Sequence, residues 1–242
     1  MVREDRDVTT ATRTSLPSSR TVPVLPRTSV ARKQLVALTG LIGVLYVLVH
    51  MLGNLHAFQG PRQLNHYGEY LRTIGEPLLP RSMLLWIARI VLVTAVSIHV
   101  ALTAQLALRS RSARPVRYVH PGVVQASYAS RTMRWGGVAL LGFIVFHLMD
   151  LSWGVHPHFV RGDVYHNVVT GFRRWPVTGV YLAAMAALGM HLYHGTWSVF
   201  QTLGVNQARW DRAIHRGALS LAVVVGLGFS TVPLAVLVHL VK

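Results

Sequence analysis

The sequence contains no cysteine and little negative charge. Without cysteine among its 242 residues, the chain can form no disulfide, no thiolate metal site and no iron–sulfur cluster held by its own side chains. Only 8 residues are Asp or Glu, against 24 Lys and Arg. Charged residues make up 13% of the chain, whereas hydrophobic residues make up 52%. This balance is unlike that of a soluble domain of this length and typical of a polytopic membrane protein.

The formal net charge of +16 raises the question of nucleic-acid binding. Nearly all of the Arg and Lys residues lie between apolar runs, however, and do not form a stripe along a helix face. Basic residues placed in this way set the orientation of membrane helices. We therefore expect a lipid bilayer as the partner of the apolar surface, and no nucleic acid.

Two regions are predicted from the distribution of apolar residues. Residues 1–31 are rich in Ser, Thr, Arg and Pro without apolar periodicity, which indicates a disordered or loosely docked tail. Residues 32–242 hold five apolar segments, each long enough to cross about 30 Å of hydrocarbon as a helix. The predicted fold is therefore all-α, a polytopic membrane protein with five transmembrane helices. The segments cover residues 34–57, 82–108, 132–153, 177–201 and 217–240.

The Lys and Arg residues are unevenly divided between the two sides of the predicted membrane. Sixteen lie on the side of the N-terminal tail and seven on the other, with Arg89 left within the second helix. The positive-inside rule therefore places the N-terminus in the cytoplasm and the C-terminus outside.

Each of the first four apolar segments carries a histidine, and an ionisable side chain inside lipid is by default a functional hypothesis. Counted along the predicted helices, His50 and His147 lie in the outer half of the membrane, and His99 and His191 in the inner half. At 1.5 Å per residue the two layers are about 10–15 Å apart. The sequence therefore predicts two histidine pairs at two depths.

Two imidazoles from different helices at one depth can fill both axial positions of a haem iron, which favours electron transfer over ligand chemistry. The sequence thus predicts two haems b, one held by His50 and His147 and the other by His99 and His191. A zinc or copper site would need three or four ligands at one depth. For any one of these histidines, a hydrogen-bonded packing role is the alternative.

Two further histidines compete for the ligand positions. His194 lies one turn beyond His191, and His56 follows His50 at the membrane edge. Small residues near the faces of the four histidines would admit a flat macrocycle, although ordinary helix packing explains each of them equally well. These small residues are Gly43, Ala95, Gly136 and Ala187.

Local motifs around the four histidines carry a family resemblance. They are HMLGN from His50, SIHVAL around His99, FHLMDLSWG from Phe146 and MHLYHGTWSVFQTLG from Met190. Residues 32–240 resemble the dihaem cytochrome b anchor of succinate dehydrogenase and fumarate reductase, most closely the single-chain b558 type of Gram-positive and actinobacterial enzymes. The family pattern His-x-x-x-Gly-x-Trp favours His191 over His194 as ligand.

The resemblance implies a division of labour among subunits in the cytoplasmic membrane of a bacterium. His99 and His191 would hold the proximal haem, and His50 and His147 the distal haem. A flavoprotein would oxidise succinate, an iron–sulfur subunit would pass the electrons on, and the haems would deliver them to a quinone, commonly menaquinone. The chain itself contains no recognisable dicarboxylate site. A higher oligomer of the complex is left open.

Further site residues follow from the charge that haem and quinone chemistry requires. Arg89 is expected to meet a distal haem propionate, with snorkelling to the outer surface as the alternative. In the outer segment NHYGEYLRTIGEP, where relatives carry an essential carboxylate, Glu69, Glu76 and Tyr67 are candidates for the quinone site, and a solvated loop is the alternative. Asp150, one turn past His147, is a further candidate for proton handling and could equally bond a neighbouring helix.

Two rival functions remain. One is the dihaem cytochrome b of a hydrogenase or formate dehydrogenase, which also places histidines on several helices. The other is a haem-free transporter or scaffold whose histidines relay protons. The sequence shows neither paired intramembrane carboxylates nor broken half-helices, which argues against transport.

Overall fold

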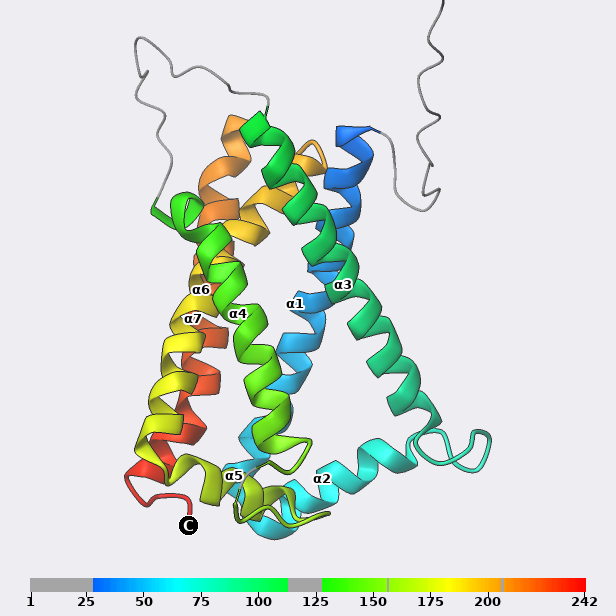
Figure 1. The fold of residues 1–242 in the computed structure, drawn as a ribbon, viewed down its shortest axis with the longest axis vertical. Coiled ribbons are helices and arrows are strands. Elements are labelled where there is room, and N and C mark those ends of the chain that lie inside the picture. Colours follow the sequence, from blue (N-terminus) through cyan, green and yellow to red (C-terminus); the bar gives the residue numbers. More distant parts are fainter. Residues whose placement is uncertain (1–27, 113–127, 156, 206) are drawn as a thin grey trace, which may run out of the picture.

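The structure is a computed structural model that describes residues 28–112, 128–155, 157–205 and 207–242. Within these ranges all regular secondary structure is helical, and five helices are long and apolar enough to cross a membrane, which confirms the predicted fold class. The predicted tail lies almost wholly outside the described residues. The five long helices are α1 (Ser29–Asn54), α3 (Met83–Ser112), α4 (Tyr128–Leu151), α6 (Trp175–Thr202) and α7 (Ala208–Leu237) (Figure 1).

Apolar composition located these helices but not their ends. They contain 24 to 30 residues, about 36–45 Å at 1.5 Å per residue, so they exceed the thickness of the hydrocarbon. The last helix begins at Ala208, nine residues before the predicted start at Gly217. Its first turns carry charged residues and continue the helix beyond its apolar part. Hydropathy marks where a helix lies in lipid, whereas hydrogen bonding decides where it begins.

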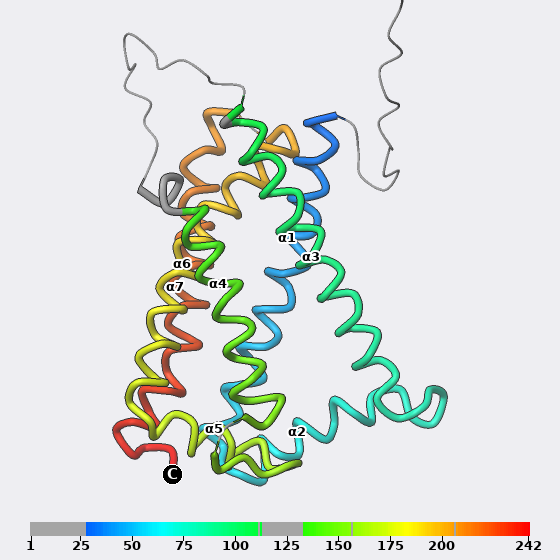
Figure 2. Tube along the Cα trace, in the orientation of Figure 1, coloured from blue at the N-terminus to red at the C-terminus, as the bar shows by residue number. Residues whose placement is uncertain are grey.

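The long helices alternate in direction and form two groups. Helix α6 packs against α7 and α4, and α1 packs against α3. Helix α1 also contacts α6 and α7, so it joins the two groups. In Figures 1 and 2, α3 leans away from the other helices toward the end of the bundle where the chain terminates. We call this the C-terminal end, and the opposite end, where α1 begins, the N-terminal end.

Two short helices cover the C-terminal end, where the sequence interpretation had only loops. Helix α2 (Pro61–Thr73) starts with Pro at its first position, and α5 (Val164–Phe172) is capped by Asp163, which accepts a hydrogen bond from the His166 amide at 2.9 Å. A 3-10 turn, η1 (Leu55–Gln59), joins α1 to α2. The candidate quinone residues of this segment therefore lie on a helix or beside it.

The protein core is small and lies along α6 and α7. One cluster of buried residues joins α5, α6 and α7 at the C-terminal end and includes Tyr181, and another joins α1, α6 and α7 around Met51. Gly228 of α7 permits the contact between α7 and Met51 of α1, because a Cβ at this position would lie 2.3 Å from the Met51 sulfur. Many large apolar side chains on the long helices are exposed. Such a surface is suited to lipid and not to water.

Candidate functional site: two histidine pairs

The first pair lies toward the C-terminal end. His50 of α1 and His147 of α4 have ring centroids 5.8 Å apart, and their planes make an angle of 77°. Tyr46 stacks on the His50 ring at 5.4 Å, and Phe229 of α7 contacts the same ring at 5.7 Å. Residues far apart in the chain are thus gathered around two neighbouring imidazoles, which we call the first pair.

The second pair lies toward the N-terminal end. His99 of α3 and His191 of α6 have ring centroids 6.3 Å apart, with 58° between their planes. Gly40 of α1 and Gly137 of α4 flank this pair. A Cβ at Gly40 would lie 3.4 Å from His99 Cε1, and one at Gly137 would lie 3.9 Å from His191 Cε1. Glycines therefore allow these two helices to approach the histidines of the other two.

The flanking contacts fix the distance between the layers. On α1, ten residues separate Gly40, beside the second pair, from His50 in the first pair. The same ten-residue step separates Gly137 from His147 on α4, and it separates Tyr181, which touches His147, from His191 on α6. Ten residues of helix rise about 15 Å. The ten-residue spacing is present in the sequence, but the hydropathy pattern alone did not reveal it.

Two of the four rings have hydrogen-bond partners on Nδ1. The His99 Nδ1 atom lies 3.2 Å from the Thr39 hydroxyl oxygen and 3.2 Å from the Val36 carbonyl oxygen. The His147 Nδ1 atom lies 3.2 Å from the Tyr181 hydroxyl oxygen. An imidazole that donates from Nδ1 keeps its lone pair on Nε2, which is the arrangement that metal-binding histidines use.

The geometry of both pairs fits axial ligation of one metal between two rings. Imidazole nitrogens bind first-row metals at about 2.0–2.1 Å, so two axial rings on one metal have centroids roughly 6 Å apart. Buried His191 Nδ1 has no hydrogen-bond partner among the described residues. A Cβ at Gly43 or Gly136 would meet nothing within 4 Å, so the structure leaves room at both positions.

The other small residues behave differently. Ala95 is buried, with 5% of its surface exposed, so it is already covered by protein. Ala187 is half-buried. No group of three or more His, Asp or Glu residues within the described ranges could hold a metal ion. What the structure brings together is two pairs of histidine rings.

The competing histidines have contacts of their own. His56 stacks on Tyr67 of α2 with centroids 4.6 Å apart, and its Nδ1 bonds the Gly53 carbonyl oxygen at 3.1 Å. His194 makes its ring contact with Trp197 at 5.7 Å. Neither makes a ring contact with a partner from the opposite helix of a pair within the described residues. Their positions favour His50 and His191 as the paired residues.

Arg89 is exposed on α3 and lies ten residues before His99, which places it at the level of the first pair. Its guanidinium lies over the Trp86 ring at 5.0 Å, and it is within electrostatic reach of Tyr46. Arg89 has no carboxylate partner within the described ranges. A cation at this depth without an acidic partner suits an anionic ligand group or a lipid headgroup.

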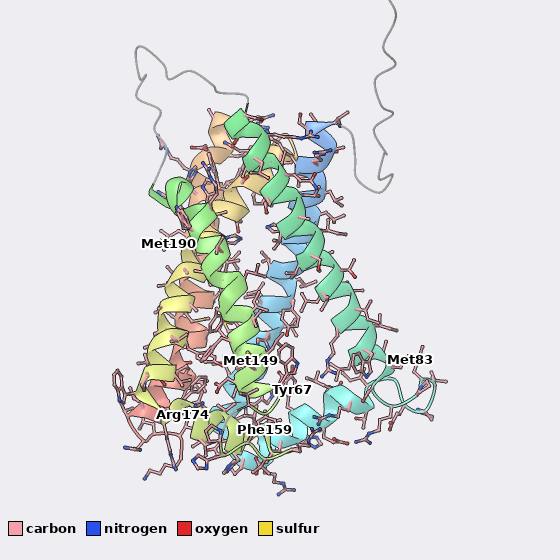
Figure 3. All side chains as sticks on the ribbon, in the orientation of Figure 1. Tyr67, Met83, Met149, Phe159, Arg174 and Met190 are labelled. Atoms are coloured by element: carbon pink, nitrogen blue, oxygen red, sulfur yellow. The ribbon has the colours of Figure 1, made fainter. Side chains whose placement is uncertain are left out.

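The candidate quinone residues are placed by α2. Tyr67 points from α2 toward the interior of the bundle (Figure 3) and covers Gly53, where a Cβ would lie 2.6 Å from its ring. Gly53 is three residues after His50, so Tyr67 lies near the first pair. Glu69 pairs with Arg81 and, at 3.5 Å, with Arg72. Glu76 is exposed in the turn that follows α2.

Among the acidic residues in the described ranges, Asp150 is nearest in sequence to a histidine of either pair. It is 6% exposed and pairs with Arg174, which precedes α6, at 2.5 Å. The Tyr181 hydroxyl donates to its other oxygen at 3.3 Å. The sequence interpretation named Asp150 but missed both partners, because an Arg before a helix and a Tyr within one have ordinary explanations.

Comparisons with known proteins add no assignment to this geometry. No protein-family model, curated protein or solved structure matches the chain.

Proposed function

We propose that the chain is a membrane cytochrome b, the anchor subunit of a succinate:quinone oxidoreductase that carries electrons through two bis-histidine haems b to a quinone. One observation supports this above all. Four helices each contribute one intramembrane histidine, and the four rings lie in two pairs with centroids 5.8 and 6.3 Å apart. The pairs are about 15 Å apart along the helices.

The residues of each pair would bind the haem iron from both sides. His99 and His191 would hold one haem, and His50 and His147 the other. A haem ligated in this way supplies a one-electron carrier without an open coordination site. The protein contributes ring orientation through the partners of Nδ1, and it surrounds the first pair with Tyr46 and apolar groups that exclude water.

Electrons must reach the haems from another subunit, because the chain has no cysteine with which to hold an iron–sulfur cluster. The N-terminal end of the bundle has exposed basic residues and would face the cytoplasm under the positive-inside rule. An iron–sulfur subunit with its flavoprotein would dock there. The family resemblance supports succinate as their substrate. The exposed basic residues include Arg109, Arg134, Arg209 and Arg212.

The quinone would react near the first pair. Tyr67 covers Gly53, three residues after His50, and Glu69 lies on the same helix as Tyr67. Arg89 would pair with a haem propionate at this level. Menaquinone is the acceptor that the resemblance favours.

Haem content tests the proposal directly. The purified chain, produced together with its partner subunits, is expected to contain two haems b by pyridine haemochrome assay and reduced-minus-oxidised spectroscopy. His50→Ala and His147→Ala should each remove the same haem, and His99→Ala and His191→Ala the other. His66→Ala, on the exposed face of α2, is the control and should keep both. A chain without haem would overturn the proposal and leave a proton relay or structural anchor.

The identity of the donor and acceptor is tested in the same preparation. A flavoprotein with succinate dehydrogenase activity should co-purify, whereas a hydrogenase or formate dehydrogenase subunit would assign the chain to that class. A menaquinone analogue should reoxidise the reduced haems. Glu69→Gln should slow this reoxidation and retain both haems, and unchanged reoxidation would remove Glu69 from the quinone site.

A further inference from the structure

A chain of polar contacts leads from His147 to the surface at the C-terminal end. The His147 Nδ1 atom lies 3.2 Å from the Tyr181 hydroxyl oxygen, which lies 3.3 Å from one oxygen of Asp150. The other oxygen of Asp150 accepts a hydrogen bond from Arg174 at 2.5 Å. These residues connect the end of α4 with the first two turns of α6. We call Tyr181, Asp150 and Arg174 the His147 relay.

The direction of the hydrogen bonds follows from the carboxylate. An ionised carboxylate only accepts, so the single hydroxyl proton of Tyr181 points at Asp150. The hydroxyl oxygen is then free to accept, and the His147 Nδ1–H donates to it. This fixes the tautomer of His147 and leaves the lone pair of Nε2 available to a metal ion.

The relay distinguishes His147 from the other three histidines. His99 donates to neutral acceptors, the Val36 carbonyl and the Thr39 hydroxyl. His191 Nδ1 has no partner within the described ranges, and the contacts of the His50 ring there are with other rings. Of the four rings, His147 is therefore the one linked through a hydrogen bond to a carboxylate in the part of the chain that the structure describes.

The relay tyrosine is held in place independently of its hydroxyl. Its ring is 5% exposed and makes edge contacts with Phe143 at 5.0 Å and Phe172 at 4.8 Å. Aromatic contacts of this kind stabilise the position of a ring beyond its burial. Replacing the hydroxyl by hydrogen should therefore leave the ring where it is, and remove only the polar link.

We propose that Tyr181 and Asp150, with Arg174 as the anchor of the carboxylate, are positioning residues that make His147 a more electron-donating axial ligand and thereby lower the midpoint potential of its haem. This inference rests on the proposed function. Hydrogen bonds from ligating imidazoles to carboxylate-linked acceptors raise the basicity of the ligand. A more basic ligand stabilises the oxidised iron, and ligand hydrogen bonding is one of the means by which proteins set haem potential.

Redox titration of the haem-loaded complex, followed by visible spectroscopy, provides the test. Tyr181→Phe and Asp150→Asn should both raise the midpoint potential of the haem held by His50 and His147. The expected change is about tenfold in the ratio of oxidised to reduced iron at a fixed potential, which is about 59 mV for a one-electron couple. The haem held by His99 and His191 should keep its potential in both variants.

Matched variants separate the relay from general damage. Tyr165→Phe removes the hydroxyl of another buried tyrosine at this end, one that donates to the Lys242 carbonyl oxygen at 2.9 Å and has no role at either pair in the proposed function. It should shift neither potential. Thr39→Val removes one neutral partner of His99, so any shift should be confined to the other haem.

The two variants decide whether the His147 relay affects the haem potential or only holds α4 and α6 together. Asp150→Asn leaves Arg174 without its anion, so this variant can lose stability; Tyr181→Phe retains the ion pair and is the decisive variant. Two haems with unchanged potentials in Tyr181→Phe would overturn the relay and leave Asp150 and Arg174 as a tie between helices. Absence of haem from the unaltered chain would instead overturn the proposed function itself.

Discussion

Gly43 is on the face of α1 that also carries His50, two helical turns away, and a Cβ there would meet no atom within 4 Å. If a macrocycle fills this space, a large side chain at Gly43 should compete with it. We predict that Gly43→Phe lowers the haem content per chain by at least half, while the protein remains folded. Haemochrome assay and size-exclusion chromatography in detergent measure the two properties.

Gly217 provides the control for this substitution. It is exposed on α7, and a Cβ there also meets nothing within 4 Å. Gly217→Phe should therefore leave haem content unchanged. Equal haem loss in both variants would show that bulk alone disturbs the helices, and full haem content in Gly43→Phe would show that the space at Gly43 belongs to lipid.

Single residues differ in how readily the sequence reveals them. A histidine in an apolar run is recognisable because its polar ring is costly in lipid, and depth counting grouped the four in the same two pairs as their ring contacts do. Tyr181 and Thr39 were missed because a tyrosine or threonine in a membrane helix needs no special explanation. Their role depends on which way each points, and this is decided by packing between helices.

At the scale of elements, the hydropathy pattern predicted the five long helices and missed α2 and α5. Both are short, and α2 is polar on most of its surface, so neither resembles a membrane span. The two helices are held together by hydrogen bonds between residues that are 98 or more positions apart in the sequence. Asn65 of α2 donates to Asp163 at 3.0 Å and accepts from the Tyr165 amide at 2.9 Å. Such long-range pairs leave no local signal.

Asp163 makes the contact between α2 and α5 sensitive to pH. Its carboxylate accepts hydrogen bonds from the His166 amide, which has the larger effect, and from the Asn65 side chain. These bonds hold the pKa of Asp163 below its ordinary value. A carboxyl whose folded pKa is lowered stabilises the fold above its unfolded pKa, and this contribution is lost as the pH falls through the folded pKa. The contact should therefore be complete at pH 7.

We predict that Asp163→Ala lowers the stability of the detergent-solubilised protein at pH 7 by about 1 kcal/mol, the usual cost of removing a helix N-cap. Thermal unfolding measured from pH 7 down to pH 3 should show the difference from the unaltered chain shrinking, because the unaltered chain loses its own carboxylate. Asp163→Asn keeps a capping side chain and should lose less at pH 7. A difference that does not change with pH would contradict the charged role of Asp163.

At the scale of the whole molecule, the two ends of the bundle differ in their acidic residues. Four of the five acidic residues in the described ranges lie toward the C-terminal end, and one toward the N-terminal end. Within the described ranges, the basic residues of the N-terminal end therefore have one acidic counterpart. Orientation in a membrane follows the count of Lys and Arg near the helix ends, which again favours the N-terminal end as the cytoplasmic one. The acidic residues are Glu69, Glu76, Asp150 and Asp163 at one end and Asp211 at the other.

The lack of cysteine allows this orientation to be measured with single introduced thiols. Leu78, 91% exposed between α2 and α3, marks the C-terminal end, and Gln207, exposed before α7, marks the N-terminal end. We predict that a membrane-impermeant maleimide labels Leu78→Cys in intact cells, and labels Gln207→Cys only after the membrane is opened. The unaltered chain should take up no label, and both variants should react in detergent.

The result decides which histidine pair would face the electron donor of the proposed function. Labelling as predicted puts His99 and His191 on the cytoplasmic side. Electrons from a cytoplasmic partner would then enter at this pair and cross about 15 Å to the pair that contains His147 and contacts the His147 relay. The reverse pattern would put His50 and His147 next to the donor and would place Glu69 and Tyr67 among the docking contacts. Equal labelling of both thiols in intact cells would contradict an odd number of membrane crossings between them.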